Sequence, residues 1–227
     1  MAGILSSSIA RKVTMALSGL FLVVFLAQHF TINLTSVISP ETFNEWSHFM
    51  GTNVLVQFVL QPILIFGVIY HFAMGFVLEL QNRKARGSQG YAMFKGSANA
   101  SWFSRNMIIS GIVILLFLGL HFYDFWVHEI TVKYIEGDMS GLDAAGNFRY
   151  HEETVAKFAG DPIRVGLYVL AFVFLIFHLL HGFQSSFQSM GFNNKYSKGL
   201  KVFTKAFAIV IPLGFAFIAI FHYVNHL

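Results

Sequence analysis

The sequence predicts an all-α membrane protein, a single domain over residues 1–227 in which five transmembrane helices form a bundle. Composition is the first indication: 56% of the residues are hydrophobic and 11% are charged, whereas a soluble domain is about a quarter charged. The second is length. Apolar stretches at about 13–38, 53–82, 103–130, 162–188 and 201–225 can each cross the roughly 30 Å core of a bilayer. The third is that the first four stretches each contain an internal histidine, a costly residue in lipid.

The first apolar stretch follows Arg11 and Lys12, an arrangement that also begins a secretory signal peptide. It continues to about Val37, well beyond the roughly 7–15 apolar residues of a signal, and no small-residue cleavage site follows. We therefore expect a retained first helix.

A short amphipathic segment separates the first two stretches. Ser39-Pro40 resembles an N-cap followed by proline at the first helical position. The residues that follow predict a short helix lying in the membrane interface. Its expected apolar face consists of Phe43, Trp46, Phe49 and Met50.

Capping residues and small-residue connections divide the rest of the chain. Asn99 or Ser101 is expected to cap the third helix, and Asp161-Pro162 to begin the fourth. Residues 87–90 and 190–194 are rich in Gly, Ser and Asn and predict connections. The stretch 131–160 is acidic and glycine-rich in its middle, so we expect an outer loop there, and its sequence suggests no role.

Basic residues orient the bundle. With the N-terminus in the cytoplasm, eleven of the 15 lysines and arginines fall on the inner side, and ten of the eleven acidic residues fall on the outer side. The positive-inside rule therefore predicts a cytoplasmic N-terminus and an outer C-terminus. This topology accounts for the basic residues, so we expect a lipid bilayer and no nucleic acid as partner. The inner basic residues are Arg11, Lys12, Arg83, Lys84, Arg86, Lys95, Arg105, Lys195, Lys198, Lys201 and Lys205.

The internal histidines fall at two depths. His29 lies 17 residues after Lys12 and His121 lies 16 after Arg105 on outward helices, so both should sit about 25 Å from the inner end. His71 and His178, on inward helices, should sit about 15–18 Å from that end. A b-type haem needs two imidazoles facing each other at one level. The depths therefore predict two stacked haems, an outer one held by His29 and His121 and an inner one held by His71 and His178.

The number of internal histidines matters as much as their depths. A single histidine in a membrane helix is about as often a hydrogen-bonding residue or part of a proton relay as a ligand, but four at matched depths favour ligation. Zinc or di-iron would require nearby carboxylates or thiols, and the chain has no cysteine. Gly75, Gly119 and Gly182 lie near the histidines and would let a flat macrocycle approach the backbone, although small residues are also ordinary in helix packing.

The histidine motifs resemble a known family, the single-chain, five-helix, di-haem cytochrome b subunits of succinate dehydrogenase and fumarate reductase. The similarity covers nearly the whole chain, and its specificity comes from the set of short motifs. They are Ala27-Gln28-His29 with Asn33, Tyr70-His71 with Gly75, Leu120-His121, and Phe177-His178 with Gly182 and Gly191.

The resemblance implies an anchor for a flavoprotein (FAD) subunit and an iron–sulfur subunit on the cytoplasmic side of a bacterial cytoplasmic membrane. Electrons from succinate would pass through the inner and then the outer haem to menaquinone, and the complex is a candidate dimer of trimers. The family spacing makes His178 the ligand and His181 a neighbour that does not bind the iron. In one branch of fumarate reductases a glutamate stands two residues before that ligand; Ile176 stands there in this chain, which favours succinate oxidation.

The outer histidines are less specific. His48 matches a histidine of one branch of the family, and with Glu41 and Glu45 it is a candidate quinone site, because passing protons requires groups that titrate near neutrality. A solvated interfacial histidine explains it equally well. For His128, His151, His222 and His226 we expect solvated side chains near the outer helix ends.

Three rival functions stay open. A fumarate reductase anchor would run the same chain in reverse, and the cytochrome b subunit of a hydrogenase or formate dehydrogenase would bind haem but serve other partners. A cofactor-free, histidine-lined transporter belongs to a different class and would show no haem absorption.

Overall fold

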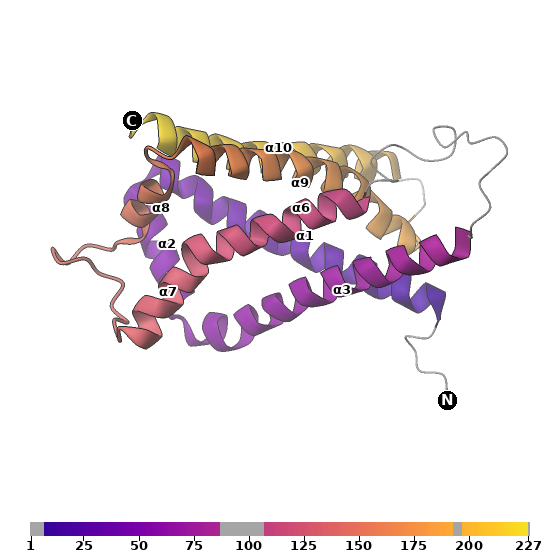
Figure 1. The fold of residues 1–227 in the computed structure, drawn as a ribbon, viewed down its shortest axis with the longest axis horizontal. Coiled ribbons are helices and arrows are strands. Elements are labelled where there is room, and N and C mark those ends of the chain that lie inside the picture. The colour runs from indigo at the N-terminus through magenta and orange to yellow at the C-terminus, as the bar shows by residue number, and fades with distance from the viewer. Residues whose placement is uncertain (1–6, 87–106, 193–196, 227) are drawn as a thin grey trace.

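The computed structural model describes residues 7–86, 107–192 and 197–226 and confirms a bundle of five apolar helices (Figure 1). The spans are Ser8–Ile38, Val56–Ala85, Met107–Ile135, Pro162–Ser189 and Ser197–Val224. Several expectations fall outside the described residues: the caps Asn99 and Ser101, the start of the third helix at 103, the connection 87–90, Asn193 and Asn194, and the basic residues Lys95, Arg105 and Lys195.

Helix α9 (Pro162–Ser189) is the centre of the packing. It lies along α10 (Ser197–Val224) and also contacts α6 (Met107–His121) and α1 (Ser8–Ile38). The buried core joins Tyr168 and Phe172 of α9 to Phe215 and Ile218 of α10. Helix α3 (Gln61–Arg86) packs mainly on α1 and lies at the opposite side of the bundle from α10 (Figure 1). Helix α1 begins and α10 ends at opposite ends of the bundle, as an odd number of spans requires.

The expected helix starts are confirmed where the structure describes them. Asp161 caps α9, its carboxylate accepting a hydrogen bond from the amide of Arg164 at 2.9 Å, with Pro162 in the first turn. Ser39 caps α2 (Pro40–Thr52), the predicted short helix. Phe43 of α2 is buried beside His151, whereas Trp46 and Phe49 are exposed. Phe43 therefore packs into the protein, whereas the rings of Trp46 and Phe49 point outward.

The third span extends further than expected, to Ile135 rather than 130. After α6 it runs through two π-helical segments, η3 (Phe122–Val127) and η4 (Thr131–Ile135), on either side of α7 (His128–Ile130). The buried Lys133 holds this extension. Its ammonium pairs with Glu129 at 2.7 Å and donates to the carbonyl of Gly51 at the end of α2. Ion pairing thus extends a helix beyond its apolar residues.

The segment 131–160 is not the continuous loop that its composition predicts. It contains η4 and a nine-residue helix, α8 (Tyr150–Phe158). Thr154 and Phe158 of α8 are buried, and the Phe158 ring packs 5.1 Å from that of Tyr168. Residues four positions apart on one face thus fold α8 onto the end of the bundle at which α10 ends (Figure 1).

Close packing of α1 against α10 depends on Gly214, and we predict that Gly214→Ala destabilises the bundle. A Cβ there would collide with the ring of Phe30, and overpacking costs about 1–3 kcal/mol. Thermal unfolding of the purified protein in detergent would measure the loss. Gly166→Ala on α9 is the matched control, because a Cβ at Gly166 meets nothing within 4 Å. Equal melting temperatures for the two variants would contradict the prediction.

Candidate functional site

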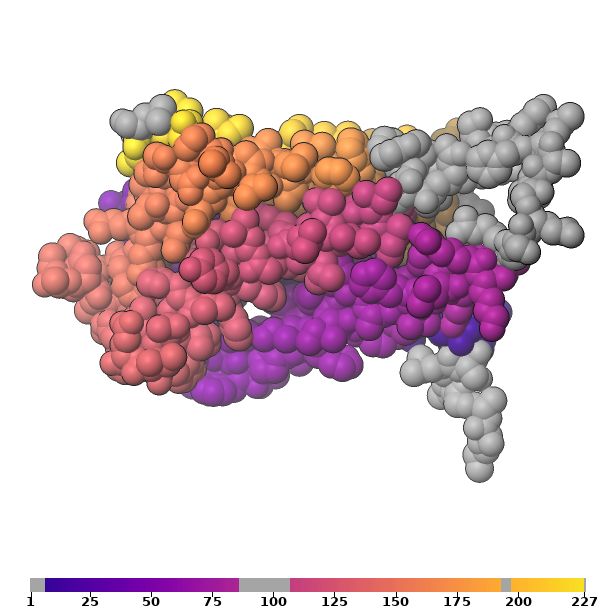
Figure 2. All heavy atoms as spheres, in the orientation of Figure 1, coloured from indigo at the N-terminus to yellow at the C-terminus, as the bar shows by residue number. Residues whose placement is uncertain are grey.

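A cavity of about 830 Å³ runs through the interior of the bundle between α1, α3, α6 and α9. Its walls are mainly apolar, and its lining extends from Lys12 near the start of α1 to Trp126 in η3. Figure 2 shows the surface hollowed between α3 and α6. All four histidines predicted from depth line the cavity: His29, His71, His121 and His178.

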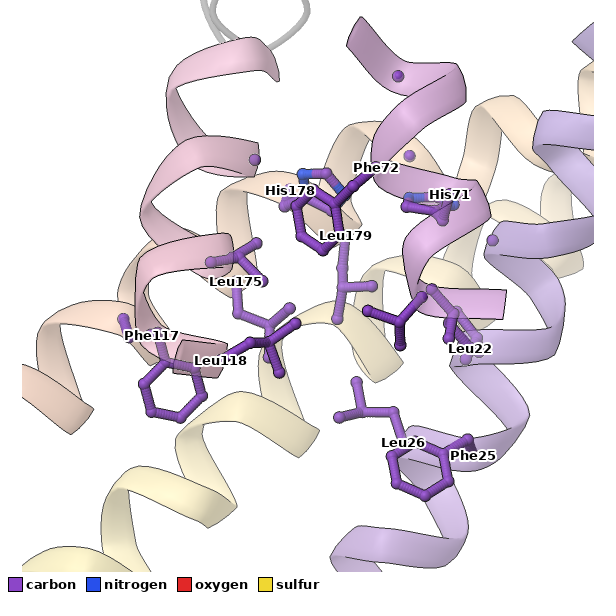
Figure 3. Close-up of a pocket in the computed structure, with 18 of the residues that line it drawn as sticks. Leu22, Phe25, Leu26, His71, Phe72, Phe117, Leu118, Leu175, His178 and Leu179 are labelled. Carbon is purple, nitrogen blue, oxygen red and sulfur yellow. The ribbon is translucent and has the colours of Figure 1, made fainter. Parts of the chain in front are cut away.

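The structure brings these histidines together in the two predicted pairs. In the inner pair, the rings of His71 on α3 and His178 on α9 have centroids 6.2 Å apart and planes inclined by 67°. Figure 3 shows both rings beside a layer of apolar side chains that includes Leu22 and Leu175. In the outer pair, the rings of His29 on α1 and His121 on α6 are 5.7 Å apart, with planes inclined by 86°.

The spacing of each pair suits two ligands of one metal ion. A bond from a metal to imidazole nitrogen is about 2 Å long, so two imidazoles on opposite sides of one ion have centroids roughly 6 Å apart. Both pairs are close to this value. The residues therefore fit a planar metal macrocycle held from both faces. Nδ1 of His121 is buried and has no hydrogen-bond partner among the described residues, unlike Nδ1 of the other three histidines.

Hydroxyl and amide groups lie beside the other three histidines. Nδ1 of His71 is 3.0 Å from the Ser18 hydroxyl of α1, and Nδ1 of His178 is 3.3 Å from the Ser110 hydroxyl of α6. Nδ1 of His29 is 3.4 Å from the amide nitrogen of Asn33, one turn further along the same helix. Of these neighbours, Asn33 was part of the sequence motif. The serines were missed, because serine is ordinary in membrane helices and its partner here lies on another helix.

Small residues open part of the cavity wall. Gly75 and Gly182 line it, and an added Cβ at either would meet only a flexible methionine methyl, at 3.7 and 3.6 Å respectively. Gly119 is exposed, and a Cβ there would meet nothing within 4 Å. The expectation that Gly119 belongs to the site is therefore wrong, because this residue faces away from His121.

The remaining site candidates lie apart from the paired rings. His181 lines the cavity about one turn beyond His178 and is half-buried. The candidate quinone residues His48, Glu41 and Glu45 lie on α2 and do not belong to the cavity lining. Glu41 and Glu45 are exposed. Hydrogen bonds from its own backbone amide and from the Ser39 hydroxyl lower the pKa of the Glu41 carboxyl, so it stays ionised near neutral pH.

His48 packs against residues of the segment 131–160. Its ring stacks on that of Phe148 at 4.5 Å, and its Nδ1 lies 3.3 Å from the Tyr150 hydroxyl. Burial and the nearby negative charge of Glu129 raise the pKa of Tyr150 to about 12. This phenol is therefore neutral and able to donate a hydrogen bond to His48.

The expectation for His222 is wrong, because its side chain is fully buried rather than solvated. Its Nε2 is 2.9 Å from the Ser36 hydroxyl of α1, and its ring lies 5.6 Å from that of His151. His151 in turn bonds the Ser36 carbonyl at 3.0 Å and is half-buried. The end of α10 packs on α1, so polar residues at this end face another helix. His226 is exposed, as expected, and His128 pairs with Glu153 at 3.1 Å while 40% exposed.

A buried polar group beside the outer pair was also missed. The Asp124 carboxylate in η3 is fully buried and accepts hydrogen bonds from Arg164 at 2.6 Å and from the Tyr168 hydroxyl at 2.7 Å. The Tyr168 ring lies 6.3 Å from that of His121. These residues join the third and fourth spans where the outer pair sits. In the sequence, Asp124 counted only as one of the outer acidic residues. Its pairing could not be seen there, because its partner Arg164 lies 40 positions further along the chain.

The fold and the site define a multi-pass membrane protein with two buried imidazole pairs in one apolar cavity. A family described as the succinate dehydrogenase/fumarate reductase transmembrane subunit matches residues 81–213. The chain belongs to this family, and it is a membrane subunit of that class of oxidoreductase complex, embedded in a bacterial cytoplasmic membrane.

A curated relative extends the likeness. The succinate dehydrogenase cytochrome b558 subunit of Bacillus subtilis (strain 168) is 24% identical over 163 residues, covering 71% of this chain and 69% of the relative. No solved structure matches significantly.

Proposed function

We propose that this chain is the di-haem cytochrome b anchor of a succinate:quinone oxidoreductase, carrying electrons from an iron–sulfur subunit through two bis-histidine b haems to menaquinone. The observation that carries the proposal is the pairing of imidazoles from different helices at two levels of one apolar cavity. Membership of the family and the cytochrome b558 name of the Bacillus relative support it.

The chain's residues would hold the two groups as follows. His71 and His178 would ligate the inner haem iron, and His29 and His121 the outer one. When bound, haem b supplies a one-electron couple between ferric and ferrous iron. Apolar side chains such as Leu22 and Phe172 line the cavity, so they would exclude water from the rings.

The partners follow from the topology. With the N-terminus in the cytoplasm, the basic residues at the inner ends of α1, α3 and α10 would face a flavoprotein subunit and an iron–sulfur subunit. The position two residues before His178 is Ile176, so the chain lacks a carboxylate there, which favours succinate oxidation over the reverse reaction. A fumarate reductase anchor is the alternative within the same family.

We place the candidate quinone site at the outer end, around His48. The neutral phenol of Tyr150 lies beside this imidazole, so the two groups supply a hydrogen-bond donor and an acceptor. Glu41 and Glu45 are exposed on the same helix and would release protons to the outside.

An absorption difference spectrum tests the proposal. The purified protein is expected to show reduced-minus-oxidised bands of b-type haem, with about two haems per chain. Purification in mild detergent should also recover a flavin-containing and an iron–sulfur subunit. A spectrum without haem bands would favour a cofactor-free transporter instead. Haem bands with hydrogenase or formate dehydrogenase subunits as partners would contradict the succinate assignment.

A further inference from the structure

We propose that Ser18 and Ser110 are positioning residues that hold the inner imidazoles in one tautomer and orientation and thereby tune the inner haem. The inference rests on the proposed function, because it assigns a role toward the group that His71 and His178 would ligate. It adds two residues from the helices that carry the outer pair.

The hydrogen bonds of Ser18 determine which nitrogen of His71 carries the proton. The Ser18 hydroxyl donates its single hydrogen to the carbonyl of Met15 at 2.8 Å. Its oxygen, 3.0 Å from Nδ1 of His71, must therefore accept a hydrogen bond from that nitrogen. A neutral imidazole protonated on Nδ1 has its lone pair on Nε2, which leaves Nε2 as the ligating atom.

Ser110 repeats this arrangement at His178. Its hydroxyl donates to the carbonyl of Met107 at 2.9 Å, and its oxygen lies 3.3 Å from Nδ1 of His178. Ser110 is also buried, so water cannot easily replace it as the acceptor. Both inner imidazoles are therefore held through Nδ1 by a serine whose own hydrogen is already engaged by its helix.

The two serines occupy equivalent places in the sequence. Ser18 precedes His29 by 11 residues on α1, and Ser110 precedes His121 by 11 residues on α6. Eleven residues make about three helical turns, so serine and histidine lie on the same face. Each of these helices would thus supply one ligand to the outer haem and one supporting hydroxyl to the inner haem.

The outer pair lacks this support within the described part of the chain. His29 contacts Asn33 of its own helix at 3.4 Å, and Nδ1 of His121 is unpartnered. A hydrogen bond from Nδ1–H to an acceptor makes an imidazole a stronger donor to its metal, and a stronger donor favours ferric iron. The serines should therefore lower the potential of the inner haem alone.

Redox titration of the purified complex, followed by absorption, tests the proposal with Ser18→Ala and Ser110→Ala. The inner component is identified as the one absent from the His71→Ala protein. Each alanine variant should raise the ferrous-to-ferric ratio of that component about threefold to tenfold at a fixed potential, which is about 30–60 mV at 59 mV per tenfold. The outer component should not move. Ser18→Thr, which keeps the hydroxyl, should restore the original value.

Two further measurements separate positioning from ordinary packing. Low-spin ferric EPR reports the angle between the two imidazole planes, so its g values should change for the inner haem in the alanine variants. Thr204→Val is the control, because the buried Thr204 hydroxyl bonds its own helix, at the carbonyl of Lys201. Ser18→Cys, a weaker acceptor of similar shape, should give an intermediate shift.

The possible outcomes distinguish failure of the proposed function from failure of the role assigned to the serines. Wild-type protein without haem bands would overturn the proposed function itself. Haem bands with unchanged inner potential and EPR signal in both alanine variants would overturn the role of the serines and leave the proposed function standing. Equal shifts in both haems, or the same shift in Thr204→Val, would also overturn it.

Discussion

Replacing His178 by alanine is expected to remove the inner haem, whereas His181→Ala should keep both. The two residues lie about one turn apart on α9 and both line the cavity, so they are a matched pair. The His178 ring faces that of His71 at 6.2 Å, and the structure gives no such ring contact for His181 among the residues it describes. We therefore expect His178, and not His181, to share a metal ion with His71.

The haem-to-protein ratio of purified protein measures the result. We expect it to fall by about half in His178→Ala and in His71→Ala, and to stay near the wild-type value in His181→Ala. Recovery of the outer haem in the two depleted proteins would show that the bundle still assembles. Equal haem loss in the His178→Ala and His181→Ala proteins would contradict the assignment.

The spans and the histidine pairs could be predicted from the sequence because both depend on one regular geometry. A membrane helix rises about 1.5 Å per residue, and the bilayer holds helices side by side, so distance along the sequence becomes depth. His29 and His121 therefore meet in the structure as the residue counts predict. The same residue counts predicted a different depth for His71 and His178.

The features that the sequence did not predict depend on which way each helix is rotated and on how the ends fold back. Ser18 and Ser110 could not be distinguished from other membrane serines until their faces were known. His222 was expected in solvent because it lies near the outer end of its helix, but α10 turns its side chain onto Ser36. The helix α8 and the extension to Ile135 result from contacts between segments, such as the bond from Lys133 to Gly51, that neither segment's composition predicts.

Removing the Asp124 carboxylate is the substitution expected to destabilise the outer half most. Asp124 is fully buried and binds both Arg164 and Tyr168. Loss of one partner of a buried ion pair costs about 3–5 kcal/mol, because the remaining charge stays uncompensated. Arg164 is 27% exposed and partly screened by solvent, so we expect a loss for Asp124→Ala near the lower end of that range, about 3 kcal/mol.

Graded variants separate the charge from the hydrogen bonds. Tyr168→Phe removes one neutral donor to the carboxylate and should cost about 1–3 kcal/mol, since a hydrogen bond to a charged group is worth more than a neutral one. Asp124→Asn keeps the volume and one acceptor but removes the charge, so its effect should lie between those of Tyr168→Phe and Asp124→Ala. Thermal unfolding of the purified protein in detergent provides the comparison.

The exposed pair of Arg83 and Glu79 is the control for this prediction. It is a short ion pair of 2.7 Å with Arg83 62% exposed, and exposed pairs contribute about 1 kcal/mol or less. Arg83→Ala should therefore leave the melting temperature nearly unchanged. Because the Tyr168 ring contacts His121, the Asp124→Ala protein should also lose the outer haem more readily than the inner one. A melting temperature as insensitive to Asp124→Ala as to Arg83→Ala would show that burial of this carboxylate does not hold the third and fourth spans together.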